Sequence, residues 1–385
     1  MMKGDFPTGE FAGRKTPFYF YDLPLLERTL DAVRSELRNR PLWQVHYAVK
    51  ANANPEILRR IAATGFGADC VSGGEVRMAY EAGFPPASIV YAGVGKSDEE
   101  ITYALELGIA RFNVESSAEL LVIEEIAAKM GKVAPVSLRV NPDIGAHTHA
   151  NITTGLAENK FGIYHGVLPE VIRLALGCPH IRFSGLHFHI GSQILDMSDF
   201  VALCNRVNNL MDTLERLGLP VGDLNVGGGL GINYEHPNHL PVADFHAYFD
   251  TFRRHLQLRW GQVLHFELGR SLVAPCGSLI CRVLYVKQGT TRQFAIVDGS
   301  MTELIRPALY HAFHRIENLT SSEPEQLYDV VGPVCESSDV FGKGVSLDAC
   351  RRGDFIAIRS AGAYGESMAS QYNGRPLPGA FLYEG

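Results

Sequence analysis

Eight short apolar runs, each separated from the next by a segment long enough for a helix, dominate residues 26–270. The intervening segments carry apolar residues at three- and four-residue steps, which is the spacing that buries one face of a helix. Strands that alternate with helices form parallel sheets, and eight of them favour a closed barrel over an open sheet. The predicted strands are 45–49, 67–71, 89–92, 111–114, 136–140, 183–188, 224–226 and 263–266.

The pattern changes in the last third of the chain, where short strands follow one another with turn residues between them, beginning with residues 278–286. This arrangement predicts a second, antiparallel β domain. Residues 16–21 form a further strand candidate that can pair with it. We therefore predict an α/β chain with a TIM-like (β/α)8 barrel over residues 26–270. A β-sandwich or β-barrel domain would cover residues 271–385 together with residues 1–25.

The composition argues against several classes of function. The 385 residues have a formal net charge of −7 and no run of Lys or Arg, so we expect no nucleic-acid partner. No segment approaches the roughly 18 uninterrupted apolar residues of a membrane-spanning helix, and residues 1–10 lack the apolar core of a signal peptide. The seven cysteines are odd in number and widely spaced, which indicates reduced thiols in a cytoplasmic protein rather than disulfides or a zinc site.

The barrel prediction gives a meaning to the polar residues at the strand ends, because the carboxyl ends of barrel strands carry the chemistry. Lys50 follows the first strand and His189 ends the sixth. A glycine-rich turn that begins at Gly227 ends the seventh, and Glu267 with Arg270 ends the eighth. We therefore expect an amine, an imidazole, a glycine turn, a carboxylate and a guanidinium to converge at one rim of the barrel.

Lys50 is the strongest single candidate for a catalytic residue. At the end of a buried strand its ammonium can face a pocket, and burial lowers the pKa of an amine so that it can form a Schiff base. The alternative is an ordinary lysine that extends its amine into water from the end of a strand.

The other motifs also have two interpretations each. The 227–231 turn can bring backbone N–H groups close to a phosphate, or it is merely a turn; its spacing does not match a dinucleotide-binding motif. Glu267 and Arg270 can hold a pyridine nitrogen and a phosphate, or form a surface ion pair. His187 and His189 have the spacing of zinc ligands in a barrel hydrolase, but such a pair is more often structural.

Taken together, these segments resemble the alanine-racemase-like, fold-type III pyridoxal-phosphate decarboxylases. The resemblance follows the chain in order from about Thr16 to Leu382, and Leu268 replaces a proline that is usual in the family. Two longer stretches, 141–162 and 304–310, narrow it to the branch that converts meso-2,6-diaminopimelate to L-lysine and carbon dioxide. The shorter segments that carry the resemblance are 47–52, 189–193, 227–231, 267–271 and 335–339.

The resemblance implies a role for each candidate residue. Lys50 would bind pyridoxal 5'-phosphate as a Schiff base, His189 would stack on its ring, and Glu267 would pair with the pyridinium nitrogen. The residues implied to hold the phosphate and nearby groups are Ser192, Gly228, Gly229, Gly269, Arg270 and Tyr364. The residues implied to bind the two ends of the substrate are Arg270, Arg306, Tyr310, Glu336 and Tyr364.

The resemblance also implies a homodimer in which the partner subunit's Cys335 and the partner subunit's Glu336 complete each active site. Cys335 is then the second catalytic residue and the candidate proton donor, because a thiol can release a proton near neutral pH when its surroundings assist. An arginine together with Glu336 could select the distal amino-acid end of the substrate over a simple diamine precursor.

Other functions remain open on these motifs. A decarboxylase of ornithine, arginine or carboxynorspermidine is disfavoured by Arg306 with Glu336, and an amino-acid racemase by the segment around Cys335. A pyridoxal-phosphate carrier without activity would not need the β domain. A zinc hydrolase would use His187 and His189, and metal analysis would test it.

Overall fold

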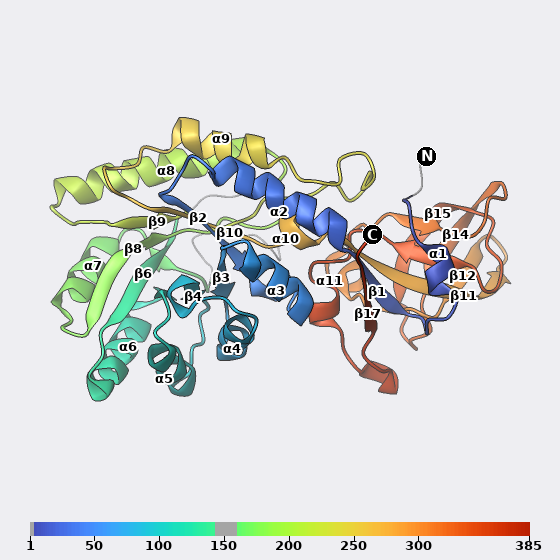
Figure 1. Cartoon of the computed structure of the whole chain (residues 1–385), viewed down its shortest axis with the longest axis horizontal. Helices are drawn as coiled ribbons and strands as arrows, with labels where there is room; N and C mark the ends of the chain where they lie inside the picture. Colours follow the sequence, from blue (N-terminus) through green and yellow to red (C-terminus); the bar gives the residue numbers. More distant parts are fainter. Residues whose placement is uncertain (1–3, 143–159) are drawn as a thin grey trace. The chain divides into compact units, whose positions relative to one another are not determined.

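The computed structural model describes residues 4–142 and 160–385 (Figure 1). The stretch 141–162, which narrowed the resemblance, therefore lies largely outside the described residues. Within the described part, the polypeptide forms two compact units.

The first unit, called here the barrel unit, comprises the described residues of Leu30–Gly231 and Asp244–Gly269. The second, called the β unit, comprises those of Met1–Thr29, Ile232–Ala243 and Arg270–Gly385. The β unit therefore takes a segment that interrupts the barrel sequence shortly before its end, as well as residues from both terminal parts of the chain.

The predicted (β/α)8 barrel is confirmed. Its strands are all parallel, and the ring closes because β5 pairs with β6 while β2 pairs with β10. Each of the predicted apolar runs corresponds to a strand of this ring. In ring order the strands are β2 (Trp43–Ala48), β3 (Gly67–Cys70), β4 (Ile89–Tyr91), β5 (Arg111–Val114), β6 (Ala134–Asn141), β8 (Ile181–His187), β9 (Asp223–Asn225) and β10 (Leu264–Leu268). A short strand, β7 (Ile163–Tyr164), pairs with the end of β6.

Helices connect the strands and cover the outside of the ring (Figure 1). Local sequence sets their ends. Helix α3 begins at Pro55, directly after Asn54, whose side chain caps it. Helix α5 is followed by the C-cap residue Gly108, whose φ of +74° suits glycine. The helices are α2 (Leu23–Leu37), α3 (Pro55–Ala63), α4 (Gly73–Glu81), α5 (Asp98–Leu107), α6 (Ser117–Met130), α7 (Leu168–Gly177), α8 (Met197–Arg216) and α9 (Phe245–His255).

The β unit is a mostly antiparallel β barrel. The N-terminal strand β1 (Phe18–Asp22) pairs antiparallel with β11 (Gly277–Gln288) and parallel with β17 (Gly379–Tyr383), so the predicted pairing of the N-terminus with this domain is confirmed. The short strands β13 and β17 were not predicted. The remaining elements are β12 (Gln293–Val297), β13 (Ile316–Asn318), β14 (Glu325–Val331), β15 (Val340–Asp348), β16 (Phe355–Ile358) and the helices α1 (Thr8–Phe11), α10 (Arg270–Val273) and α11 (Arg306–Tyr310).

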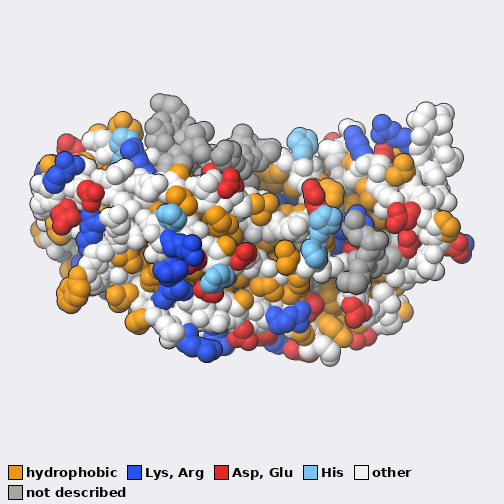
Figure 2. All heavy atoms as spheres, turned by 90° about the horizontal axis from the view of Figure 1, so that it is seen from above, with side chains coloured by type: hydrophobic (Ala, Val, Ile, Leu, Met, Phe, Trp, Pro, Cys, Tyr) orange, Lys and Arg blue, Asp and Glu red, His pale blue; other side chains and the backbone are white. Residues whose placement is uncertain are grey.

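The surface carries charges of both signs. On the face shown in Figure 2, Lys and Arg side chains are interspersed with Asp and Glu, and apolar side chains lie between them. Among the helices of the described residues, none has the length and apolar character that crossing a membrane requires.

An aromatic cluster ties the N-terminal segment into the core of the β unit. Phe11 is fully buried, and its ring centroid lies 5.3 Å from that of Phe18, 5.6 Å from that of Phe20 and 5.7 Å from that of Phe355. The rings meet edge to face, the arrangement that aromatic quadrupoles favour. The N-terminal segment around Phe11 thus packs against β16, a strand near the C-terminus of the chain.

Replacing this central ring should destabilise the β unit. Phe11→Ala should lower the free energy of unfolding by about 3–5 kcal/mol, because it removes a fully buried ring and leaves a cavity. Denaturant unfolding would measure the change. The control is Leu327→Ala, which shortens a 64% exposed side chain of the same unit. Equal losses in the two variants would contradict the assignment of Phe11 to the core.

Candidate active site

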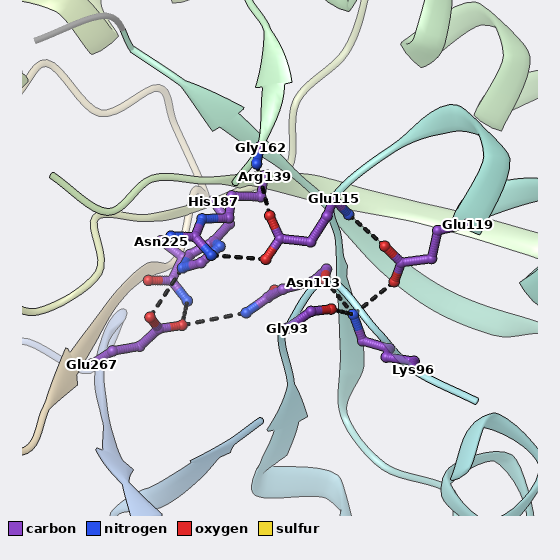
Figure 3. Close-up of polar contacts among 10 residues, drawn as sticks. All are labelled: Gly93, Lys96, Asn113, Glu115, Glu119, Arg139, Gly162, His187, Asn225 and Glu267. Atoms are coloured by element: carbon purple, nitrogen blue, oxygen red, sulfur yellow. Dashed lines mark hydrogen bonds and ion pairs between the residues drawn. The ribbon is translucent and has the colours of Figure 1, made fainter. Parts of the chain in front are cut away.

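Glu267 lies at the centre of a buried hydrogen-bond network at the carboxyl ends of the barrel strands (Figure 3). Its Oε1 accepts hydrogen bonds from Asn225 Nδ2 at 2.7 Å and from Asn113 Nδ2 at 3.3 Å. Its Oε2 lies 2.9 Å from Nε2 of His187. Strands β5, β8 and β9 thus each supply one partner for the carboxylate on β10.

These surroundings keep Glu267 ionised. Burial acts to raise its pKa, but the interactions with His187 and with the charge of Lys50 outweigh burial and hold the pKa well below its usual range. The nearby carboxyl of Asp69 behaves oppositely, because burial and the charge of Glu267 raise its pKa well above the usual value. The surroundings therefore favour the charged form of Glu267 and disfavour the charged form of Asp69.

Lys50 lies in the middle of a 3-10 turn, η1 (Val49–Ala51), which directly follows β2. The turn buries Val49 and Ala51 and leaves Lys50 exposed between them. The lysine is nevertheless close to the network. Burial, together with the charge of Lys50, holds the pKa of His189 well below its ordinary value, so this imidazole is neutral.

The glycine turn 227–231 packs against the segment 189–193, which contains Ser192. The backbone N–H of Gly228 donates to Nδ1 of His189 at 3.3 Å. A Cβ on Gly228 would lie 1.8 Å from the carbonyl oxygen of Glu267, and Gly229 has a φ of +108°. Only glycine therefore fits at these positions, and the backbone comes close to the imidazole and the carboxylate strand.

The backbone of Gly269 lies close to two alanine side chains, because a Cβ there would be 3.1 Å from the Cβ atoms of Ala48 and Ala51. The end of β10 thus packs tightly against the turn that carries Lys50.

A second set of predicted residues lies in the β unit. Arg270 donates to the hydroxyl of Tyr234 at 2.7 Å, and Arg306 donates to the same oxygen at 3.0 Å. The guanidinium carbon of Arg270 also lies 4.9 Å from the ring centroid of Tyr364. Arg306 and Tyr310 begin and end helix α11.

Cys335 and Glu336 are exposed in the connection between β14 and β15. The hydroxyl of Tyr372 donates to Oε1 of Glu336 at 2.7 Å, and the backbone N–H of Cys335 donates to Oδ1 of Asn373 at 3.3 Å. The structure therefore gathers the predicted residues into a barrel set and an arginine set, and it leaves these two on the surface of the chain.

Sequence reasoning missed Asn113 and Asn225. Each interrupts a buried apolar strand, and a polar side chain in such a place must find a partner, which is a signal that could have revealed them. His187, a candidate zinc ligand, is bonded to Glu267 instead. The described residues contain no group of three or more side chains arranged to hold a metal ion.

Comparison with known proteins identifies the family. The family described as "Pyridoxal-dependent decarboxylase, pyridoxal binding domain" matches residues 24–274. The chain is 62% identical over 377 residues to diaminopimelate decarboxylase of Bacteroides thetaiotaomicron, with 98% of each chain covered. It is 42% identical to the diaminopimelate decarboxylase of Helicobacter pylori whose structure is complexed with L-lysine, with a TM-score of 0.92 over 98% of this chain and 94% of the other. For the M. jannaschii enzyme complexed with L-lysine, the identity is 35% and the TM-score 0.87, over 97% and 88%. The resemblance seen in the motifs is confirmed, and the chain belongs to the diaminopimelate decarboxylases of the pyridoxal-dependent decarboxylase family.

Proposed function

We propose that this chain decarboxylates meso-2,6-diaminopimelate to L-lysine and carbon dioxide, with pyridoxal phosphate held by the barrel unit. The observation that carries the proposal is the buried Glu267, hydrogen-bonded by side chains of three other barrel strands, in a chain that is 62% identical to a diaminopimelate decarboxylase. L-lysine, the product of this reaction, is the ligand named for the solved Helicobacter pylori relative. These relatives are decarboxylases, so a racemase, a zinc hydrolase and an inactive carrier are all disfavoured.

The residues of the barrel unit fit pyridoxal phosphate. The glycine turn has no side chain at Gly228 and a left-handed backbone at Gly227 and Gly229, so its N–H groups can approach a phosphate. The anionic Glu267 suits a protonated pyridine nitrogen. Asp69 adds a buried Oδ1 that has no hydrogen-bond partner among the described residues. The barrel unit therefore brings two carboxyl groups, those of Glu267 and Asp69, and the backbone N–H groups of a glycine turn to the ends of its strands.

Each residue of the barrel unit has a distinct task. When bound, pyridoxal phosphate delocalises the electron pair that remains after carbon dioxide leaves. Glu267 keeps a proton on the pyridine nitrogen, and Asn113 with Asn225 keeps Glu267 oriented. Lys50 would supply the amine that holds the cofactor covalently, and His189 would lie against its ring. Ser192, Gly228, Gly229 and Gly269 would hold its phosphate.

The β unit supplies substrate recognition. Arg270, Arg306 and Tyr310 would bind the carboxylate groups of the substrate, and Tyr364, whose ring lies beside Arg270, would act with them. Guanidinium groups suit this role because their planar N–H donors match the two oxygens of a carboxylate. Arg270 directly follows Gly269 in the sequence, so phosphate and substrate residues are neighbours along the chain.

Cys335 and Glu336 act from the partner subunit of a homodimer. Both are exposed on their own chain, which is the placement that a shared active site requires. Cys335 returns a proton to the carbon that has lost carbon dioxide, and Glu336 binds the amino group of the distal end of the substrate.

We place the protein in the cytoplasm, in keeping with its seven unpaired cysteines.

Removing the amine of Lys50 should abolish activity. Wild-type protein supplied with pyridoxal phosphate should release carbon dioxide from meso-diaminopimelate, and Lys50→Ala should lower kcat at least about 10³-fold. Borohydride reduction followed by mass spectrometry should attach the cofactor to Lys50 in the wild type alone. Lys129→Ala is the control, because this side chain is 70% exposed on α6 and pairs with the surface residue Glu125. Substantial activity in Lys50→Ala would refute the assignment.

Filling the glycine turn should weaken cofactor binding. Gly228→Ala places a methyl group against the carbonyl oxygen of Glu267, so the turn must shift and the affinity for pyridoxal phosphate should fall about tenfold or more. Absorbance titration with the cofactor measures this. Gly177→Ala, where a Cβ meets nothing within 4 Å, is the control and should bind normally. Unchanged affinity in Gly228→Ala would remove the turn from the site.

Mixing two inactive variants should restore activity if the sites are shared. Lys50→Ala and Cys335→Ala each lose activity alone, but a mixed dimer regains one complete site. Subunits that exchange at random should then show about a quarter of wild-type activity. Activity that stays at the level of the separate variants, while the chains demonstrably form mixed dimers, would show that each subunit works alone.

A further inference from the structure

Tyr234 connects the two arginines of the β unit, although none of the motifs discussed above includes it. It lies in the segment Ile232–Ala243, which follows the glycine turn in the sequence and belongs to the β unit. The side chain is buried, and its hydroxyl accepts a hydrogen bond from Nη1 of Arg270 at 2.7 Å and one from Nη1 of Arg306 at 3.0 Å. One oxygen atom therefore sets the distance between two guanidinium groups.

Arg306 is held from a second side by His314. Its Nη1 lies 2.9 Å from Nε2 of His314, and Nδ1 of the same imidazole lies 2.8 Å from the carbonyl oxygen of Arg359. A carbonyl can only accept, so the proton is on Nδ1 and Nε2 accepts from Arg306. Burial, and then the charge of Arg306, lower the pKa of His314 to about 3, which keeps this tautomer neutral.

Ring contacts complete the arrangement. The guanidinium carbon of Arg306 lies 5.1 Å from the ring centroid of Tyr234, and the rings of Tyr234 and His314 meet nearly edge to face with centroids 5.1 Å apart. The tyrosine thus acts on Arg306 both with its ring and with its hydroxyl, whereas it contacts Arg270 through the hydroxyl.

The electrostatics explain why a phenol stands here. Two buried guanidinium groups repel each other, and a shared acceptor between them offsets that repulsion. Burial acts to raise the pKa of Tyr234, but the charges of Arg270 and Arg306 outweigh it and lower this pKa. A hydrogen bond to the hydroxyl uses one of the five N–H groups of each guanidinium. It also fixes the orientation of the guanidinium plane, whose paired N–H donors bind the two oxygens of a carboxylate.

We propose that Tyr234 is a positioning residue for substrate recognition: its hydroxyl sets the separation and orientation of Arg270 and Arg306 so that they receive the carboxylate of the distal, non-reacting end of the substrate. The inference rests on the proposed function, which assigns these arginines to the substrate. It adds a determinant of specificity, because a diamine without that carboxylate gains nothing from the paired guanidinium groups.

The variant Tyr234→Phe tests the inference, since it keeps the ring and removes only the shared oxygen. We expect KM for meso-diaminopimelate to rise about tenfold while kcat stays within about threefold of wild type. Inhibition by L-lysine, which retains the distal carboxylate, should weaken by a similar factor. Inhibition by 1,5-diaminopentane, which lacks it, should not change.

Tyr328→Phe is the matched control. It removes the same atom from another buried tyrosine of the β unit, whose hydroxyl accepts from the backbone N–H of Cys350 at 3.0 Å, and it should leave all four quantities unchanged. An unaltered KM in Tyr234→Phe would overturn the inference, as would equal weakening of both inhibitors, which would indicate a general packing role. A wild-type enzyme that does not act on meso-diaminopimelate would overturn the proposed function instead.

Discussion

The buried carboxylate of Glu267 is the interaction on which the site of the barrel unit depends. An ionised carboxylate away from water is costly unless donors surround it, and here Asn113, Asn225 and His187 do so from three different strands. β9 pairs directly with β10 and β8 pairs with β9, whereas β5 lies elsewhere in the ring, so the curved sheet of parallel strands brings three partners that are far apart in the sequence to one carboxylate. The barrel thereby holds the pKa of this carboxyl low, and the resulting charge adds to burial in raising the pKa of Asp69.

The two units divide the chemistry between them. The barrel unit holds the groups suited to a phosphate and a pyridine ring, and the β unit holds the guanidinium groups suited to carboxylates. Arg270 and Arg306 differ from surface arginines mainly in their burial and in the acceptors that orient them, so the recognition that we propose for them depends on geometry more than on residue type.

Much of the fold could be predicted from the sequence, because strand and helix signals are local. Apolar runs bounded by turn residues located the barrel strands, and capping residues such as Asn54 placed the helix ends. The short strands β13 and β17 carry too few residues to show a period. The membership of Ile232–Ala243 in the β unit has no local signal either, since it depends on packing against residues more than 70 positions away, such as Arg306.

By itself, the sequence determined the kinds of chemical group available and the strand ends that carry them: the amine of Lys50, the glycine turn and the carboxylate of Glu267. Only the tertiary structure decided their state. It left Lys50 exposed beside two buried neighbours, and it made Glu267 an anion and His189 a neutral base. The physical reason is that strand propensity depends on neighbouring residues, whereas burial, hydrogen-bond partners and pKa depend on groups that the folded chain brings together from distant positions.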